Sequence, residues 1–261
     1  MNRIDGNNIP DNKDEVRLFM VGIDAAELIP HVFRHYFDIG VGRIFYIDNN
    51  STDNSLEVLT GQDRVHVWTQ ADIFSGYGTP AKSGAAWIES LMLNYGVDNW
   101  CLLADTDELF VYPGYKDISI YDFVTRLDGD CITADFIDMY SNKKVSDTVI
   151  EGSLLETCPF TDKSGNCRER VLGFRPNLIK MPLFRFTQAI SVGAGFHGVS
   201  GYNRMASVRC SVLHFKFLSG LSVRLGRHGH KMSGSDIKAV AYKDIGEVNF
   251  YDDDVSVRLE E

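Results

Sequence analysis

Apolar and polar positions alternate along the first half of the chain in blocks typical of strands followed by helices. Short apolar runs predict buried strands, and these are Val16 to Val21, Ile44 to Ile47, Val65 to Trp68, Cys101 to Ala104 and Cys131 to Ile137. Apolar residues at helical spacing predict helices between them, from Leu28 to Phe37 and from Ala85 to Tyr95. This alternation predicts an α/β fold with a mixed, mostly parallel sheet flanked by helices.

The second half of the chain is less regular. Residues 153–170 are polar and predict a loop, whereas Val208 to Leu218 predicts another strand. Strict alternation in that strand would turn His214 and Lys216 together to the face opposite the core. We predict a leader over residues 1–14 that is flexible, one domain over 15–245 and an acidic peripheral tail over 246–261.

Charge and composition exclude some partners. The chain has 261 residues and a formal net charge of −10, which disfavours a nucleic-acid partner, because phosphates call for a basic surface. The polar N-terminus contains no secretory signal and no run can span a bilayer, so we expect a cytoplasmic protein. Peripheral contact at the inner face of the membrane stays open, as does the oligomeric state. The five cysteines show no metal-binding spacing, which favours free thiols.

Two carboxylates directly follow a predicted buried strand. Asp105 and Asp107 lie at its carboxyl end, where one intervening residue lets both turn toward a single cation. Hard oxygen ligands of this kind suit Mn²⁺ or Mg²⁺. An acidic loop without a metal is the plainer alternative, and the neighbouring Glu108 favours the metal.

Polar segments also follow the first two strands. Asp48-Asn49-Asn50-Ser51-Thr52-Asp53 can bond a base and a ribose, although the same side chains can also cap a helix. After the first strand, Asp24 and Glu27 have capping-box spacing, which predicts Asp24 as the N-cap of the first helix. Ligands of open α/β sheets bind beyond the carboxyl ends of the strands, where both segments are expected.

Several segments, in the same order along the chain, resemble family 2 glycosyltransferases. Ile47 to Ser55 looks like the D-N/D-x-S-T-D-x-S/T signature of that family, and Trp100 to Phe110 looks like its W-x-x-x-x-D-x-D-E segment. Further segments are similar to a bacterial subgroup, namely Arg34-His35-Tyr36 with Gly40-Val41, Arg168 to Gly173, Lys180 to Leu183 and Leu213 to Phe217. Many relatives carry an Asn-Glu pair after the first strand, where this chain has Asp24-Ala25.

The resemblance implies a GT-A fold and a function. It implies transfer of a sugar from a nucleotide-diphospho-sugar donor to a glycan or lipid-linked acceptor, usually with inversion, in the synthesis of surface polysaccharide or lipopolysaccharide. Asp48 and Asn49, in the segment that ends at Asp53, would contact the base and ribose.

The resemblance also implies a metal site. Asp105 and Asp107 would bind Mn²⁺ or Mg²⁺ and the donor ribose, and His214 would complete the metal site. Lys216 would neutralise the departing diphosphate. A surface-exposed His214 and Lys216 without such roles is the alternative.

Inverting transfer needs a base that takes the proton of the acceptor hydroxyl. Asp138, just after a predicted strand, is the first candidate and Glu169 is the second, although Asp138 could cap a turn and Glu169 could pair with an arginine. The flanking Arg168 and Arg170 could bind a phosphate or an anionic acceptor. His197, in the glycine-rich stretch 193–201, predicts a loop that closes over the donor, or an ordinary surface connection.

Two rival functions stay open. A sugar nucleotidyltransferase would favour a glycine- and lysine-rich phosphate loop after the first strand, and Gly22-Ile23-Asp24-Ala25-Ala26 is not one. A nucleotide- or glycan-binding protein on a catalytically degenerate GT-A scaffold is the second rival. The intact Asp105, Asp107 and His214 disfavour it.

Overall fold

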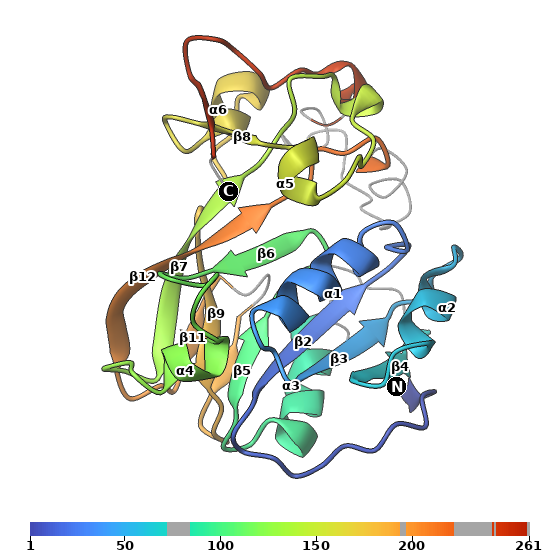
Figure 1. Ribbon diagram of the computed structural model, residues 1–261, viewed down its shortest axis with the longest axis vertical. Helices are drawn as coiled ribbons and strands as arrows, with labels where there is room; N and C mark the ends of the chain where they lie inside the picture. The colour runs from blue at the N-terminus through green and yellow to red at the C-terminus, as the bar shows by residue number, and fades with distance from the viewer. Residues whose placement is uncertain (72–83, 194–196, 222–241, 243, 260–261) are drawn as a thin grey trace. The chain divides into compact units, whose positions relative to one another are not determined.

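The computed structural model describes residues 1–71, 84–193, 197–221, 242 and 244–259 (Figure 1). The chain forms two compact units, which we call the sheet unit (Met1–Asp135 and Ile179–Val212) and the small unit (Phe136–Leu178 and Leu213–Glu261). These units divide the chain at other positions than residues 14 and 245, and the boundaries predicted there stay predictions. None of the helices in the described ranges is long and apolar enough to cross a membrane.

A large mixed sheet organises the described chain. Its strands are β1 (Asn2–Arg3), β2 (Val16–Gly22), β3 (Arg43–Asp48), β4 (Val65–Thr69), β5 (Trp100–Leu103), β6 (Glu108–Val111), β7 (Cys131–Asp138), β9 (Ile179–Arg185) and β12 (Met205–His214). Their order in the sheet is β1-β4-β3-β2-β5-β9-β7-β12-β6. The neighbours β4, β3, β2 and β5 pair in parallel, whereas β1 and β9 pair antiparallel with β4 and β5. The predicted α/β fold with a mixed sheet flanked by helices is therefore confirmed.

Helices cover both faces of the parallel strands (Figure 1). The helices of the sheet unit are α1 (Ile29–Asp38), α2 (Ser55–Thr60), α3 (Gly84–Tyr95) and α4 (Ile120–Val124), with the short strands β10 (Ser191–Val192) and β11 (Val199–Ser200) beside them. On one face Phe19 stacks on Phe45 at 4.7 Å between ring centroids, in a core that includes Met92 of α3. On the other face Tyr46 contacts Phe33 of α1 at 6.2 Å. Burial on both faces explains why these strands are continuous apolar runs in the sequence.

The small unit has its own core. Its elements are the 3₁₀ helices η2 (Val145–Asp147) and η4 (Ile245–Glu247), the helices α5 (Leu154–Thr157) and α6 (Cys167–Leu172), and the strands β8 (Phe160–Asp162) and β13 (Ser256–Arg258). The stretch 153–170, predicted as a loop, thus contains two short helices and a strand. Phe250 is buried against Phe217 at 3.9 Å, and β13 pairs with β8. Both features lie within the predicted peripheral tail.

All five cysteines are buried and free. Burial raises the pKa of each thiol, for instance that of Cys158 to about 12, so these side chains are inert apolar packing at neutral pH.

The first 14 residues make specific contacts with the sheet, which the prediction of a flexible leader did not anticipate. The strand β1 pairs with the edge strand β4. The side chain of Asp5, only 2% exposed, accepts hydrogen bonds from the backbone N–H groups of Asn7 (3.0 Å) and Val67 (2.8 Å) and from Arg3.

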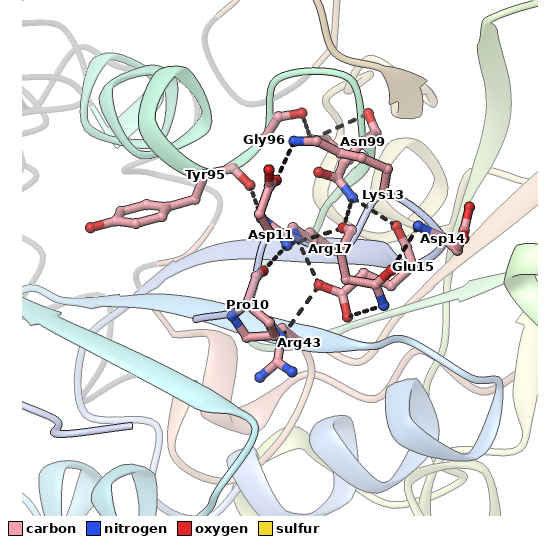
Figure 2. A network of polar contacts seen from close by, with 12 residues as sticks. Pro10, Asp11, Lys13, Asp14, Glu15, Arg17, Arg43, Tyr95, Gly96 and Asn99 are labelled. Carbon is pink, nitrogen blue, oxygen red and sulfur yellow. Dashed lines mark hydrogen bonds and ion pairs between the residues drawn. The ribbon is translucent and has the colours of Figure 1, made fainter. Parts of the chain in front are cut away.

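A buried arginine ties the next part of this segment to the sheet (Figure 2). Arg17 of β2 is 2% exposed and donates to Glu15 at 2.8 Å, to the Pro10 carbonyl at 2.8 Å and to the Asn12 carbonyl at 3.1 Å. The buried Asn99 also donates to the Asn12 carbonyl, at 2.8 Å. The guanidinium thus exchanges hydration for an ion pair and several carbonyl oxygens, which is the condition for burying a charge.

Removing the Arg17 guanidinium should unfold the protein more easily. Arg17→Ala removes the guanidinium that donates to Glu15 and to the carbonyls of Pro10, Asn12 and Tyr95, so we expect a loss of about 3–5 kcal/mol in the free energy of unfolding. Chemical denaturation measures this loss. The control is Arg204→Ala, which removes an exposed ion pair with Asp128 and should cost under about 1 kcal/mol. Equal effects of the two changes would refute the anchoring role.

The Asp5 carboxylate makes this anchor sensitive to acid. Burial alone would raise the pKa of Asp5, but the Arg3 guanidinium and the backbone N–H groups outweigh burial and lower this pKa below its ordinary value. A carboxylate with a lowered pKa stabilises the fold above its ordinary pKa of about 3.9 and loses this contribution as the pH falls below it.

Asp5→Asn should therefore reduce stability at pH 7 and narrow the difference in stability between pH 7 and pH 3. Urea unfolding at the two pH values measures both effects. The exposed Asp63→Asn serves as the control and should change neither quantity. An unchanged difference in Asp5→Asn would contradict the prediction.

Candidate functional site

The carboxyl ends of three parallel strands meet where the order of the sheet reverses. The chain builds β2, β3 and β4 in one direction and then returns to place β5 on the other side of β2. Crevices at such switch points are where open α/β sheets bind ligands. The loops that follow β2, β3 and β5 are therefore the candidate site of the sheet unit.

The loops after β2 and β3 are locked together. The Asp24 carboxylate accepts from the backbone N–H groups of Thr52 (2.7 Å) and Asp53 (3.2 Å). In return, the N–H of Asp24 donates to Ser51 Oγ at 2.9 Å and that of Ala26 donates to Asp53 at 3.1 Å. The predicted N-cap role of Asp24 is wrong, since α1 begins after Leu28 and has no side-chain cap. Asp24, at φ +48°, instead connects the loop after β2 to the loop after β3 through these hydrogen bonds.

The residues predicted to contact the nucleotide lie on these loops. Asp48, the last residue of β3, is 1% exposed and accepts hydrogen bonds from Ser51, through the N–H at 3.0 Å and through the hydroxyl. Asn49 is buried and donates to the Gln70 carbonyl at 3.0 Å. Asp53 is exposed and accepts from the N–H of Ser55 at 2.9 Å. The polar signature thus builds the loops, whatever ligand they bind.

Gly22 lets the third loop approach the first. A Cβ on Gly22 would lie 2.7 Å from Thr106 Cγ2, within the Asp105-Thr106-Asp107 turn, and 1.8 Å from Tyr46 Oη. Tyr46 is fully buried, and its hydroxyl has no hydrogen-bond partner among the described residues. Only glycine leaves room here for both the turn and the tyrosine.

A buried lysine lies against the acidic turn after β5. Lys180 of β9 is 2% exposed and donates to the buried Glu108 and, at 3.4 Å, to Asp105 Oδ2. The N–H of Asp105 donates to Glu108 at 3.1 Å. Burial alone would lower the pKa of Lys180, but the carboxylates of Glu108, Asp105 and Asp107 outweigh burial and raise this pKa. The lysine therefore stays charged and offsets part of the negative charge of the turn.

Lys180 belongs to a segment used for the family resemblance, yet its place in the site was not predicted. A lysine in a strand is ordinarily exposed, and local pattern gives no sign that this one is buried beside Glu108. A single lysine followed by the apolar residues Met181 and Leu183 is the signal that could have indicated that Lys180 is buried.

The remaining carboxylates of the turn suit a hard cation. Asp105 and Asp107 are both half-exposed, so that their oxygen atoms face solvent as well as protein. Glu108 is committed to Lys180. Two accessible carboxylates that leave room for water and phosphate oxygens fit Mg²⁺ or Mn²⁺ better than a closed site for zinc.

His214 is not on an outward face, which corrects the prediction from strand alternation. The strand β12 ends at His214, and Leu213, His214 and Phe215 are all buried. In the small unit His214 Nδ1 lies 2.7 Å from Asp138 Oδ1, and Arg168 donates to both oxygen atoms of Asp138.

Asp138 has the environment of an ion-paired structural carboxylate. Burial alone would raise its pKa, but the charge of Arg168 and the hydrogen bond with His214 outweigh burial and lower this pKa to about 2. A general base needs a pKa nearer the working pH and room for the incoming hydroxyl. The first candidate for the base thus has neither property.

Glu169 and the arginines beside it also have hydrogen-bond or ion-pair partners. Glu169 is half-exposed on the first turn of α6 and accepts from Asn166 Nδ2 at 2.8 Å; it pairs at 3.6 Å with Arg175 and not with the arginines beside it. Arg170 donates to Asp162 and to the Phe250 carbonyl, both at 2.6 Å. Arg168 and Arg170 are thus each paired with a buried carboxylate of the small unit, Asp138 and Asp162.

His197 and Lys216 are the two remaining predicted residues. His197 is half-buried, and its Nδ1 lies 2.8 Å from the Ile179 carbonyl. Lys216 is half-buried, with Nζ 5.4 Å from the centre of the Tyr242 ring. Residues 194–196 of the predicted closing loop lie outside the described residues.

Known proteins give a limited comparison. No protein-family model matches the sequence, and no curated protein matches it. The crystal structure of S. aureus TarS 1–349 is 11% identical, with a TM-score of 0.44 over 77% of this chain and 60% of that chain. Its complex with UDP is 10% identical, with a TM-score of 0.43 over 76% and 60%. A nucleotidyl transferase from Methanothermobacter is 13% identical, with a TM-score of 0.29 over 50% and 63%.

This chain spans less than two thirds of the length of each of these structures. The assignment of a function therefore depends on the residues of this chain.

Gly22→Ala should displace the acidic turn and destabilise the protein by about 1–3 kcal/mol, the usual cost of overpacking. Part of this cost comes from the Tyr46 hydroxyl, so the double change Gly22→Ala with Tyr46→Phe should be less destabilised than the sum of the single changes. Tyr46→Phe alone should be neutral or stabilising, because it removes a buried hydroxyl without a partner. Chemical denaturation of the four proteins forms a double-mutant cycle, and additive effects would refute the close approach.

Proposed function

We propose that the protein is a metal-dependent glycosyltransferase of the GT-A type that uses a nucleotide-diphospho-sugar donor. The observation that carries the proposal is the meeting of the Asp105-Thr106-Asp107 turn with the loop after β2 at the switch point of the sheet. The resemblance to family 2 glycosyltransferases supplies the substrate class: a glycan or lipid-linked acceptor, in the synthesis of bacterial surface polysaccharide or lipopolysaccharide.

Each loop binds a different part of the donor. Asp48, Asn49 and Asp53 serve the base and ribose side, on the loop that Asp24 holds in place. Asp105 and Asp107 bind the cation, with Asp105 held by Lys180. A divalent cation bound there supplies Lewis-acid stabilisation of the diphosphate that leaves.

Residues from the second half of the chain have the remaining roles. His214 is the third metal ligand, as the resemblance implies, and Lys216 neutralises the diphosphate. Glu169 takes the proton of the acceptor hydroxyl. The oxygen atom of that hydroxyl attacks the anomeric carbon as the bond from this carbon to the diphosphate breaks. Glu169 is preferred to Asp138 because half of its side chain is exposed.

The loop after β2 disfavours a nucleotidyltransferase. A phosphate cradle needs backbone N–H groups that point at the ligand. The N–H groups of Asp24, Ala25 and Ala26 instead donate to side chains of the loop after β3 and the start of α2. This loop is a scaffold for its neighbour.

Asp107→Ala should remove metal-dependent nucleotide binding. Calorimetry with uridine and guanosine diphosphates, with and without Mn²⁺, measures the affinity of each protein. Loss of a direct ligand should weaken binding with Mn²⁺ at least about 10-fold, since even residues that only orient metal ligands contribute that much. The exposed Asp63→Ala is the control and should bind like the unchanged protein.

Three outcomes separate the candidate functions. Absence of Mn²⁺-dependent binding in the unchanged protein would refute the transferase. Binding without hydrolysis or transfer of any donor in a screen would favour a binding protein on a degenerate scaffold. Activity that survives Asp107→Ala would refute the metal assignment.

A further inference from the structure

The Asp138 carboxylate lies where polar groups from three parts of the small unit converge. Arg168 Nε donates to Oδ2 at 2.7 Å, and NH2 of the same guanidinium donates to Oδ1. The Cys167 thiol lies 3.9 Å from Oδ2, and His214 Nδ1 lies 2.7 Å from Oδ1. Both oxygen atoms of the carboxylate are therefore engaged, and its orientation is fixed by a planar, two-point contact with Arg168.

These contacts determine which ring nitrogen of His214 carries the proton. Nδ1 lies 2.7 Å from Asp138 Oδ1 and 3.0 Å from Arg168 NH2. An arginine nitrogen only donates, and an ionised carboxylate only accepts. A lone pair on Nδ1 would face the ionised carboxylate at the shorter distance, which is repulsive, whereas a proton there makes a charge-assisted hydrogen bond. The distances therefore favour a proton on Nδ1, which in the neutral ring leaves the lone pair on Nε2.

The ring is also fixed in orientation. The Phe136 ring lies 4.5 Å from the imidazole, centroid to centroid, and the His214 carbonyl accepts from the Met139 N–H at 2.9 Å. Arg168 itself lies over the rings of Phe136 and Phe217, at 5.7 and 6.0 Å. His214 is therefore held through its side chain and through its backbone.

We propose that Asp138 and Arg168 are a positioning pair that holds His214 as the Nδ1–H tautomer, so that Nε2 is the nitrogen it offers to the divalent cation. This inference rests on the proposed function for the identity of the ligand. The chemistry has a general basis, since a histidine that binds a metal donates its other ring N–H to a carboxylate or carbonyl, which fixes the tautomer and raises the basicity of the ligand. Arg168 stops the carboxylate from turning away from the ring.

The tautomer can be tested on the full chain without metal or substrate. Long-range ¹H–¹⁵N correlation spectra of the histidine rings distinguish the two neutral tautomers and the imidazolium, and His214→Gln identifies the signal. We expect the Nδ1–H tautomer at neutral pH. An Nε2–H tautomer or an imidazolium would overturn the proposal, because neither offers a lone pair on Nε2.

The positioning role can be tested with a matched pair of variants. Asp138→Asn should weaken binding of Mn²⁺ in the presence of uridine diphosphate about 10-fold or more and populate both tautomers of His214. Asp162→Asn is the control, because Asp162 is also a buried carboxylate paired with an arginine of α6 but has no contact with His214 among the contacts described. It should cost stability without changing Mn²⁺ affinity or the tautomer.

The outcomes keep this inference separate from the proposed function. If the unchanged protein binds no Mn²⁺ with the nucleotide, the proposed function fails, whatever the tautomer. If it binds Mn²⁺ and Asp138→Asn binds equally well, the positioning role fails and the proposed function stands. If Asp138→Asn does not fold, the tautomer in the unchanged protein still decides the proposal.

Discussion

The position of β2 between β3 and β5 is the constraint on which the candidate site depends. Gly22 lies opposite Asp48 and Phe19 lies opposite Leu103, so the three strands end at the same edge of the sheet. A slip of one residue would turn every apolar side chain of β2 to the other face. Because both faces are buried, the cost of a slip is high, and the packing of apolar side chains fixes the positions of the acidic loops.

Buried charges then refine this arrangement. Lys180, Arg17 and Arg168 each lose water on folding, and each is bonded to buried carboxylates or carbonyl oxygens. A buried ion pair adds little net stability over apolar packing, but loss of one partner is strongly unfavourable. Such pairs therefore act mainly by excluding other arrangements. In this protein they hold the Asp105 turn, the first 14 residues and the His214 ring.

The sequence predicted the strands well where burial on both faces made them continuous apolar runs. Cys101 to Ala104 and Cys131 to Ile137 match β5 and β7 to within a residue. Alternation failed between residues 208 and 218, because the strand ends at His214 and buried residues continue beyond it. The capping-box spacing at Asp24 failed for another reason. Capping-box spacing describes bonds within one helix, whereas Asp24 bonds to a loop 28 residues further along the chain.

The chemistry of the candidate site was predictable in kind but not in detail. Asp105 and Asp107 could be placed at a strand end because the apolar run before them is unambiguous. The partners of Asp138 could not be predicted, since Arg168 lies 30 residues away and His214 lies 76 residues away. Contacts of this kind depend on the tertiary fold and leave no periodic signal in the sequence.

The same contacts bear on the base of the proposed transfer. A carboxylate whose pKa is about 2 holds a proton weakly, and both oxygen atoms of Asp138 are already occupied by donors. For Asp138 to take a proton, Arg168 and His214 would have to give up their shared acceptor within a buried cluster. Glu169 meets no such obstacle, because its side chain is half-exposed and its hydrogen bond from Asn166 leaves acceptor capacity on the carboxylate. The cost of breaking the buried cluster thus separates the two carboxylates: Asp138 orients His214, and Glu169 is the better acceptor for the proton.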